Sequence, residues 1–274
     1  MKSKLLLLGL FISILLPSQV FSKDLIMTAP PRESVEKGQK IYAPVAAHLS
    51  KILGVKVTYV HPGNWLNYQR EMRNDKYDVI FDGPHFVSWR MAHLGHKVVA
   101  KLPGHLQFAL FTHVDSKKYN KPNDLVGRKI CGISPPNLST MSIIDNYRNP
   151  VRQPVIKGIK GGMGKVYKSF KKGMCDALVL RTAFYKKKLK DEDRKSIKRL
   201  YLTKKLPNQA ISVSKRLSDN HVKLIANSLT IGKGVGSTKG ILKRFGGKAK
   251  SFIPAKQEEF VGHNMLLEGV IFGW

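Results

Sequence analysis

The sequence predicts an α/β protein made of two lobes, each built around a parallel-rich sheet. Apolar, strand-like runs alternate with amphipathic helical segments along most of the chain, and short links join them. Such alternation is typical of parallel sheets covered by helices. The rhythm breaks in the charged, proline-containing stretch at residues 112–129 and then restarts. We interpret this break as the passage from one lobe to the other.

The first lobe begins with strands and helices in regular alternation. Its expected strands cover residues 24–29, 55–60, 77–81, 96–102 and 106–114, and its expected helices cover residues 35–54, 64–75 and 84–95. Three residues mark helix ends: Gly54 closes the first helix, Asn64 caps the second, and Pro84 takes the first position of the third.

The second lobe repeats the alternation, and the chain then becomes mainly helical. Its expected strands cover residues 129–134, 153–159, 175–180 and 197–203, and its expected helices cover residues 141–148 and 164–173. The later helical segments are expected at residues 218–229, 238–245 and 255–267, packed back on the first lobe. We therefore assign residues 23–112 and 206–274 to the first lobe and residues 113–205 to the second.

The first 22 residues have the three parts of a secretory signal peptide. The basic "MKSK" precedes the apolar "LLLLGLFISILL" and the polar "PSQVFS", which predicts cleavage near Ser22 and an exported protein. Two cysteines, Cys131 and Cys175, remain after cleavage. An even number in an oxidising compartment predicts one disulfide, and the alternative is two buried thiols.

The formal net charge of +30 raises the question of a nucleic-acid partner. The lysines are scattered, acids are interleaved with them at residues 185–199, and lysine outnumbers arginine about three to one. Together with the export signal, this distribution argues against a nucleic-acid partner. The positive field still favours anions as ligands.

No catalytic pattern stands out in the chain. The sequence has no nucleophile elbow, no HExxH and no paired carboxylates at usable spacing, since "DED" at 191–193 lies in a charged surface run. The stretch "KGIKGGMGK" lacks the context of a phosphate-binding loop. We therefore expect neither an enzyme nor a cofactor. The one group of possible metal ligands consists of first-lobe histidines, which we interpret mainly as scattered surface or core residues: His61, His85, His93, His96, His105 and His113.

Three helix starts are candidate ligand-facing positions. Trp65 follows the cap Asn64 and either stacks on a ligand or covers the core. Asp82 ends the third strand, where ligands of open parallel sheets bind, and it also suits a helix cap. The stretch "PPNLSTMS" carries Ser139, Thr140 and Ser142, more hydroxyls than a cap requires, so we expect an anion at that helix start.

Several stretches, taken in order, resemble the substrate-binding components of ABC importers for phosphate, phosphite and phosphonates. The stretches that carry the resemblance are "APPRESVEKGQKIYAPVAAHLSKILGVKV", "MRNDKYDVIFDGPHFV", "VDSKKYNKPNDLVGRKICG", "PPNLSTMS" and "KKGMCDALVL". The resemblance covers nearly all of the mature chain. It implies a type II periplasmic binding protein whose two lobes are joined by a two-strand hinge and close on a ligand in the cleft between them.

The resemblance also implies a set of site residues. Ser139 and Thr140 would donate hydrogen bonds to an oxyanion, and Asp82 could accept one from a protonated oxyanion. The expected ligand set is Ser139, Thr140 and Ser142 on one lobe and Trp65, Asp82 and His85 on the other, with Arg181 and Arg32 as further members.

The chain departs from the family pattern in two places. Met163 and Gly164 stand near the position where some phosphonate binders have a histidine. Arg181 to Ala183 stand where aminophosphonate binders carry a carboxylate, so an anionic group is favoured over an ammonium.

The resemblance thus predicts a periplasmic, monomeric solute-binding protein that delivers a small phosphorus oxyanion or phosphonate to an ABC permease in the inner membrane. Two alternatives remain open at this point. The same fold could signal ligand-dependent closure to a membrane kinase, or it could capture a metal or another nutrient through the histidines.

Overall fold

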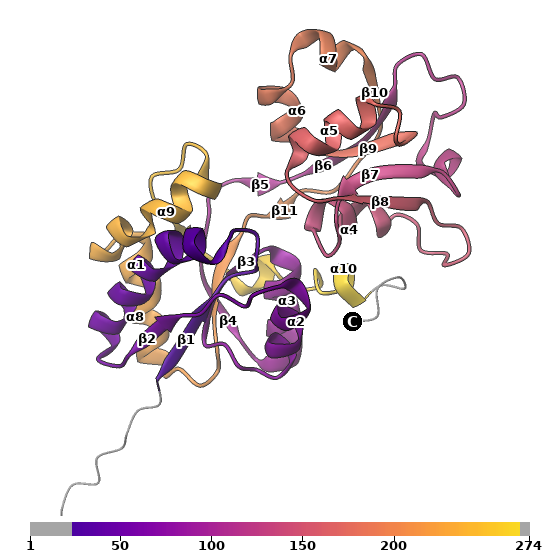
Figure 1. Cartoon of the computed structure of the whole chain (residues 1–274). Coiled ribbons are helices and arrows are strands. Elements are labelled where there is room, and N and C mark those ends of the chain that lie inside the picture. The colour runs from indigo at the N-terminus through magenta and orange to yellow at the C-terminus, as the bar shows by residue number, and fades with distance from the viewer. Residues whose placement is uncertain (1–23, 269–274) are drawn as a thin grey trace, which may run out of the picture.

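The computed structural model describes residues 24–268, and residues 1–23 and 269–274 lie outside that part. The described chain forms two lobes joined by thin crossing segments (Figure 1), which confirms the predicted two-lobed α/β fold. The predicted signal peptide falls outside the described residues. Within residues 24–268, no helix is long and apolar enough to cross a membrane.

The first lobe is built on a six-stranded sheet with the order β13-β4-β12-β3-β1-β2. The strands are β1 (Leu25–Thr28), β2 (Val57–Tyr59), β3 (Val79–Asp82), β4 (Lys97–Lys101), β12 (Ala210–Val213) and β13 (Ile253–Pro254). β1 pairs in parallel with β2 and β3, as the alternation predicts. β12 lies between β3 and β4 and is antiparallel to both.

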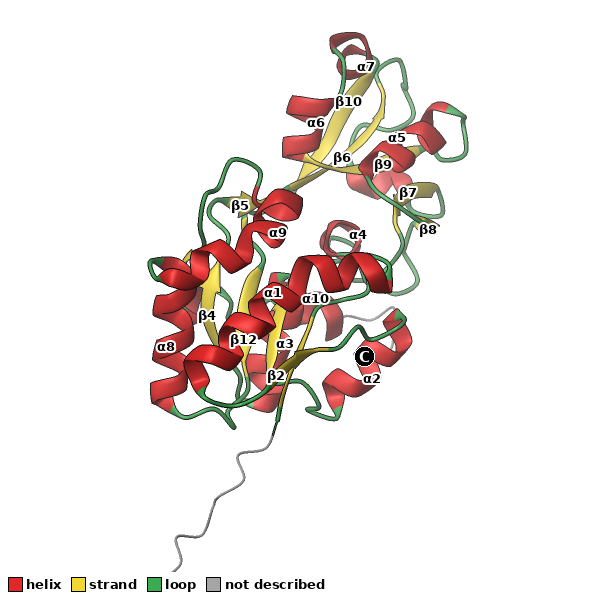
Figure 2. Ribbon diagram, turned by 60° about the vertical axis from the view of Figure 1, so that its left-hand side comes forward, coloured by secondary structure: helices red, strands yellow, loops and turns green. Residues whose placement is uncertain are grey.

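Helices cover both faces of this sheet (Figure 2). They are α1 (Val35–Leu53), α2 (Trp65–Arg73), α3 (Pro84–Leu94), α8 (Asp219–Thr230) and α9 (Lys239–Ile241). Side chains alternate across β3, so Val79 and Phe81 pack with α1, α8 and α9, whereas Ile80 packs with α2 and α3. The end of β3 is therefore buried between two helical layers.

The second lobe is built on a five-stranded sheet with the order β10-β6-β9-β7-β8. Its elements are β6 (Phe108–His113), β7 (Lys129–Ile133), α4 (Leu138–Ile144), β8 (Val155–Ile159), α5 (Met163–Lys171), β9 (Ala177–Arg181), α6 (Thr182–Lys188), α7 (Asp191–Lys195) and β10 (Ile197–Leu202). β7 is parallel to β8 and β9, and β6 is antiparallel to β9 and β10. α4 packs on the face that carries Leu110 and Val179, and α5 packs on the opposite face, with Phe111.

Two short strands form the connection between the lobes. β5 (His105–Leu106) pairs antiparallel with β11 (Leu206–Pro207). The chain crosses through β5 into β6 and returns through β11 into β12. β6 and β12 each follow a crossing and run antiparallel to their neighbours, which is why the strand–helix rhythm did not predict their direction.

The pairing of β6 changes one predicted boundary. The sequence assigned residues up to 112 to the first lobe, because the strand rhythm continues without interruption. β6 instead pairs with β9 and β10 of the second sheet, so the first crossing lies at β5. The chain returns to the first lobe through β11.

The predicted helix at residues 255–267 is wrong for most of its length. The structure has a 3-10 turn at Gln257–Glu259, further turns, and a short helix, α10 (Met265–Glu268). Gln257 explains the interruption, because its side chain amide pairs with the backbone N–H and C=O of Val98 in β4. These bonds fix the segment along the sheet edge, where β13 also pairs with β4.

α10 lies between the two lobes. Leu267 packs in the first-lobe cluster of Tyr68 and Phe86. The preceding residue, Leu266, packs instead against the second-lobe cluster that contains Leu138. The C-terminal part of the described chain therefore contacts both lobes.

Cys131 and Cys175 form a disulfide with a Cα–Cα distance of 5.6 Å, as predicted. Cys131 lies in β7 and Cys175 shortly before β9, which is the neighbouring strand. Both residues belong to the apolar cluster under α5. The bond closes a loop with a sequence separation of 44 residues inside the second lobe.

We expect the Cys131→Ala, Cys175→Ala double variant to lose about 2–4 kcal/mol of unfolding free energy, because the unfolded chain regains the entropy of an open loop. Urea denaturation of the variant and the oxidised wild type measures the difference. Reduced wild-type protein is the matched control and should shift in the same direction. Equal midpoints for all three samples would contradict a stabilising bond.

Candidate functional site

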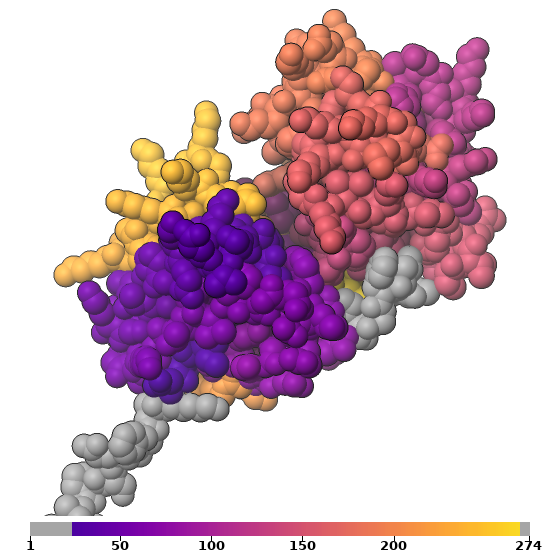
Figure 3. All heavy atoms as spheres, in the orientation of Figure 1, coloured from indigo at the N-terminus to yellow at the C-terminus, as the bar shows by residue number. Residues whose placement is uncertain are grey.

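A cavity of about 130 Å³ lies where the lobes meet beside the hinge. Figure 3 shows the two lobes facing each other across this region. The lining comes from both lobes and from the crossing segments: Arg32, Trp65, Gly83, His85, Phe86, Leu106, Phe108, Ile133, Pro136, Asn137, Leu138, Met163, Arg181 and Gln209. Four predicted site residues, Arg32, Trp65, His85 and Arg181, are thus brought together.

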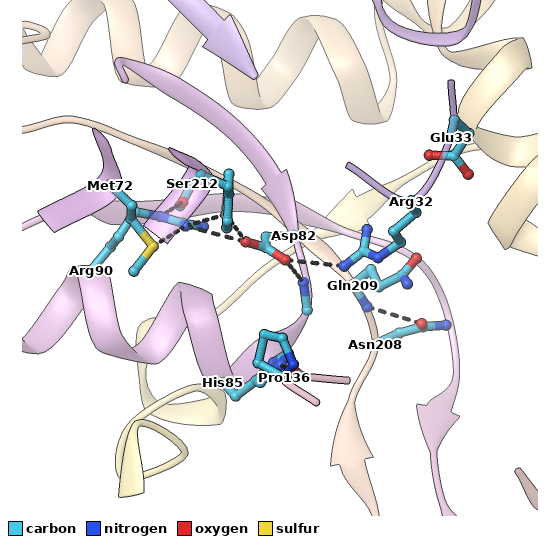
Figure 4. A network of polar contacts seen from close by, with 12 residues as sticks. Arg32, Glu33, Met72, Asp82, His85, Arg90, Pro136, Asn208, Gln209 and Ser212 are labelled. Atoms are coloured by element: carbon cyan, nitrogen blue, oxygen red, sulfur yellow. Dashed lines mark hydrogen bonds and ion pairs between the residues drawn. The ribbon is translucent and has the colours of Figure 1, made fainter. Parts of the chain in front are cut away.

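Asp82 lies directly behind the cavity, at the buried end of β3. Its carboxylate is fully buried and accepts hydrogen bonds from Arg32 Nη2 at 3.1 Å, Arg90 Nη1 at 3.3 Å and the backbone N–H of Gly83 at 2.6 Å. The hydroxyl of Tyr68 also donates to it. Figure 4 shows Asp82 between the two arginines.

These four donors occupy the hydrogen-bonding capacity of the Asp82 carboxylate. Tyr68 stays protonated, since burial and the neighbouring Asp82 charge raise its pKa well above the usual value. Asp82 does not line the cavity in this structure. It holds Arg32 and Arg90 in place. Its oxygens are occupied by these donors, so none is free in this structure to accept the predicted hydrogen bond from a protonated ligand.

The buried cluster carries more positive than negative charge. Two guanidinium groups face one carboxylate, and both Arg32 Nη1 and Arg90 Nη2 are buried without a hydrogen-bond partner. A buried donor without a partner is costly, and more so when it is charged. An anion in the cavity beside Arg32 would supply the missing acceptor and the missing negative charge.

His85 connects the two lobes. It sits in the first turn of α3, and its Nε2 lies 3.1 Å from the carbonyl oxygen of Pro136 in the second lobe. Burial, with a contribution from Arg32 and Arg90, lowers the pKa of His85 to about 4, although Asp82 and the Pro136 carbonyl oppose the shift. The neutral ring therefore carries its hydrogen on Nε2 and donates it to Pro136.

Arg181 approaches the cavity from the second lobe, at the end of β9. It is partly buried, and burial lowers its pKa, but a guanidinium keeps its charge. Its side chain has no hydrogen-bond or ion-pair partner among the described residues. The cavity thus has an incompletely paired cation on each lobe, Arg32 on one and Arg181 on the other.

An aromatic wall completes the first-lobe side. Trp65 begins α2 and stacks on Phe86 with ring centroids 6.1 Å apart and an interplanar angle of 18°. The Trp65 side chain is partly exposed and lines the cavity. Both readings of Trp65 from the sequence are therefore compatible, because the ring covers the core and also faces the cavity.

Ser139, Thr140 and Ser142 do not line this cavity. Ser139 Oγ donates to Asn137 Oδ1, Thr140 Oγ1 to the Ile133 carbonyl, and Ser142 Oγ to the Leu138 carbonyl. Gly132 makes the close approach of Thr140 possible, because a Cβ there would overlap the Thr140 hydroxyl. The hydroxyl hydrogens are committed within the α4 region, and a donor role toward a ligand stays a prediction.

Sequence reasoning did not identify Gln209, nor Arg90 and Tyr68 as partners of Asp82. Gln209 follows β11 and reaches the cavity only because the chain crosses between the lobes twice. Arg90 could have been noticed, since it is an arginine among largely apolar residues in the segment predicted as the third helix. No spacing in the sequence connects Tyr68 with Asp82.

The first-lobe histidines do not form a metal site in the described part of the chain. Residues 24–268 contain no group of three or more His, Cys, Asp or Glu side chains that could hold a metal ion. His61 contacts the Glu33 carbonyl, and His96 contacts Asp75.

Comparison with known families matches residues 27–260 to the model described as "ABC transporter, phosphonate, periplasmic substrate-binding protein". The match covers most of the chain and confirms the resemblance seen in the sequence. No curated protein matches the chain in a sequence search.

Solved structures share the fold at low sequence identity. A Xanthomonas citri protein bound to a chloride ion has a TM-score of 0.70 at 11% identity, covering 90% of this chain and 98% of its own. PhnD1 from Prochlorococcus marinus in complex with methylphosphonate has a TM-score of 0.64 at 16% identity, covering 90% and 97%. A binding protein component of an ABC phosphonate transporter from Pseudomonas aeruginosa has a TM-score of 0.59 at 14% identity, covering 89% and 85%.

Two buried histidines predict a pH dependence of stability. Burial lowers the pKa of both His85 and His96 to about 4, and Arg90 adds to the effect on each. Because an unfolded histidine titrates near 6.5, the unfolded chain binds more protons between pH 4 and 6.5. The contribution of these two histidines to the unfolding free energy is therefore fully present above pH 6.5. It decreases as the pH drops toward 4, by at most about 3 kcal/mol per histidine.

Urea denaturation at several pH values between 7.5 and 4.5 measures this dependence. The His96→Gln variant removes one of the two groups, and its unfolding free energy should change less steeply below pH 6.5 than that of the wild type. Identical slopes for the two proteins would contradict the assignment.

Proposed function

The chain belongs to the family of periplasmic substrate-binding proteins of phosphonate ABC transporters, and on that premise we propose that it captures a small phosphorus oxyanion or phosphonate between its lobes. The single observation that carries the proposal is the pair of incompletely paired guanidinium groups, Arg32 and Arg181, that reach one small cavity from opposite lobes. Two like charges facing the same cavity favour closure only when an anion lies between them.

The size of the cavity supports a small ligand. At about 130 Å³ it is well below the roughly 300–1,000 Å³ of pockets for drug-sized molecules. A tetrahedral oxyanion with a small substituent suits this volume, whereas a nucleotide does not. The apolar side chains of Trp65, Phe86, Phe108 and Met163 offer a surface for a carbon substituent on phosphorus.

The arrangement also suggests how capture proceeds. The anion first meets the first-lobe side, where Arg32 and the positive end of the α3 dipole favour negative charge. Closure then adds Arg181 and brings the Pro136 carbonyl to His85 Nε2. Binding energy from the second set of contacts would stabilise the closed lobes, as in hinge closure around a ligand.

We further propose that the protein acts in the periplasm as a monomer, passes its ligand to an ABC permease in the inner membrane, and performs no catalysis. The described cavity lining supports the last point, because it offers a neutral histidine and two arginines but no nucleophile beside a base.

Replacement of Arg181 tests the anion site directly. The Arg181→Gln variant should bind methylphosphonate roughly 30-fold more weakly or worse, since removing one partner of a buried charge contact typically costs about 2 kcal/mol or more. Isothermal titration calorimetry at constant salt measures the dissociation constant.

Arg199→Gln is the matched control, because Arg199 is an exposed arginine on β10 of the same lobe. It removes the same charge from the protein without touching the cavity. Equal losses for both variants would indicate a general field effect. An unchanged affinity in Arg181→Gln would refute the proposed site.

A further inference from the structure

The backbone at Gly83 packs closely against the His85 ring and lies near Arg32. A Cβ at this position would lie 3.0 Å from His85 Nδ1 and 4.0 Å from Arg32 Nη2. Gly83 also lines the cavity. A hydrogen-bond acceptor, His85 Nδ1, and a cationic donor, Arg32, therefore lie close to each other on the cavity wall.

His85 Nδ1 is buried and has no hydrogen-bond partner. The other ring nitrogen, Nε2, is committed to the Pro136 carbonyl, which can only accept. In the neutral ring Nδ1 therefore has a lone pair and no hydrogen. A ligand group that forms a hydrogen bond with His85 Nδ1 must therefore be the donor.

Burial keeps the His85 ring neutral, and the nearby arginines add to this effect. Arg32 and Arg90 approach it from the first lobe, and Arg181 lines the same cavity from the second. Asp82 is the only facing acid among the described residues, and its oxygens are occupied by Arg32, Arg90, Tyr68 and the Gly83 N–H. A protonated His85 would add another cation without a free counter-charge.

The same charges decide which donor the ligand can carry. An ammonium would meet the guanidinium groups of Arg32 and Arg181 and no free carboxylate, so it is disfavoured. A P–O–H group donates a hydrogen bond while the ligand as a whole remains an anion. This combination satisfies both the acceptor at His85 and the donors at Arg32 and Arg181.

We propose that the cavity selects the singly protonated monoanion of a small phosphonate, whose P–O–H group donates to His85 Nδ1 while its other oxygens accept from Arg32 and Arg181. The proposal rests on the proposed function and makes His85 the residue that determines specificity. Fully ionised anions of the same shape leave Nδ1 unpaired and place an oxygen lone pair against it.

Gln209 adds a second buried acceptor to the cavity wall. Its Oε1 has no hydrogen-bond partner, but a side chain amide can turn and present its NH₂ group instead. His85 has no such freedom while Pro136 holds its Nε2–H. The discrimination therefore depends mainly on His85.

Methylphosphonate and methanesulfonate form a matched pair of probes. At mildly acidic pH both are monoanions with a methyl group and a tetrahedral centre, but only methylphosphonate has a hydrogen to donate. Calorimetry with the wild-type protein at pH 6 should show methanesulfonate binding at least about 100-fold more weakly, because a site built for a hydrogen bond rejects an analogue that lacks it. Equal affinities for the two anions would overturn the proposal and leave the proposed function intact. Binding of neither anion would instead count against the proposed function.

The pH profile gives an independent measurement. Methylphosphonate affinity should fall as the pH rises through the second pKa of the ligand, approaching tenfold per pH unit, because the monoanion becomes scarce. Methanesulfonate stays a monoanion, so its weaker binding should stay constant over the same range. A methylphosphonate affinity that rises with pH would overturn the proposal.

The His85→Gln variant separates the two ring nitrogens. The glutamine amide can still donate to the Pro136 carbonyl, but it supplies no equivalent of Nδ1. We expect methylphosphonate affinity to fall toward that of methanesulfonate, while methanesulfonate affinity changes little. If the folded variant still binds methylphosphonate 100-fold more tightly than methanesulfonate, another group accepts the hydrogen bond from the ligand. That result would overturn the role of His85.

Discussion

The structure depends on an unequal set of charges buried at the end of β3. Asp82 holds Arg32 and Arg90 at 3.1 and 3.3 Å with no solvent exposure of its own side chain. Removing the carboxylate would leave two buried cations without a counter-charge, and removing Arg32 would alter the charge that faces the cavity. The same three residues thus stabilise the first lobe and leave it with an excess of buried positive charge beside the cleft.

The hinge topology explains why this cluster faces a cavity rather than solvent. β6 and β12 each follow a crossing between lobes and insert antiparallel into the sheet they enter. Residues at the crossings, such as Phe108 and Gln209, therefore form the floor between the two walls. Arg181 arrives on the opposite wall because β9 pairs with β6 and ends where β6 begins.

Sequence reasoning was most successful where one local signal decides the structure. The caps at Asn64 and Gly54, the turn into Pro84 and the disulfide all follow from neighbouring residues or simple chemistry. It was weaker where distant groups compete for one atom. The hydroxyl of Thr140 donates to the Ile133 carbonyl. The Asp82 oxygens accept hydrogen bonds from Tyr68 and two arginines. Such competition is decided by tertiary packing, which spacing in the sequence does not encode.

α10 gives the molecule a third mechanical link besides the two crossing strands. Neighbouring residues Leu266 and Leu267 are anchored in different lobes, so relative rotation of the lobes must either shear the Leu266 contact or pivot around it. A ribbon of two short strands resists twisting poorly, whereas an off-axis anchor restricts the motion to fewer directions. We therefore expect the contacts of α10 to limit the directions in which the two lobes can rotate when the cleft opens.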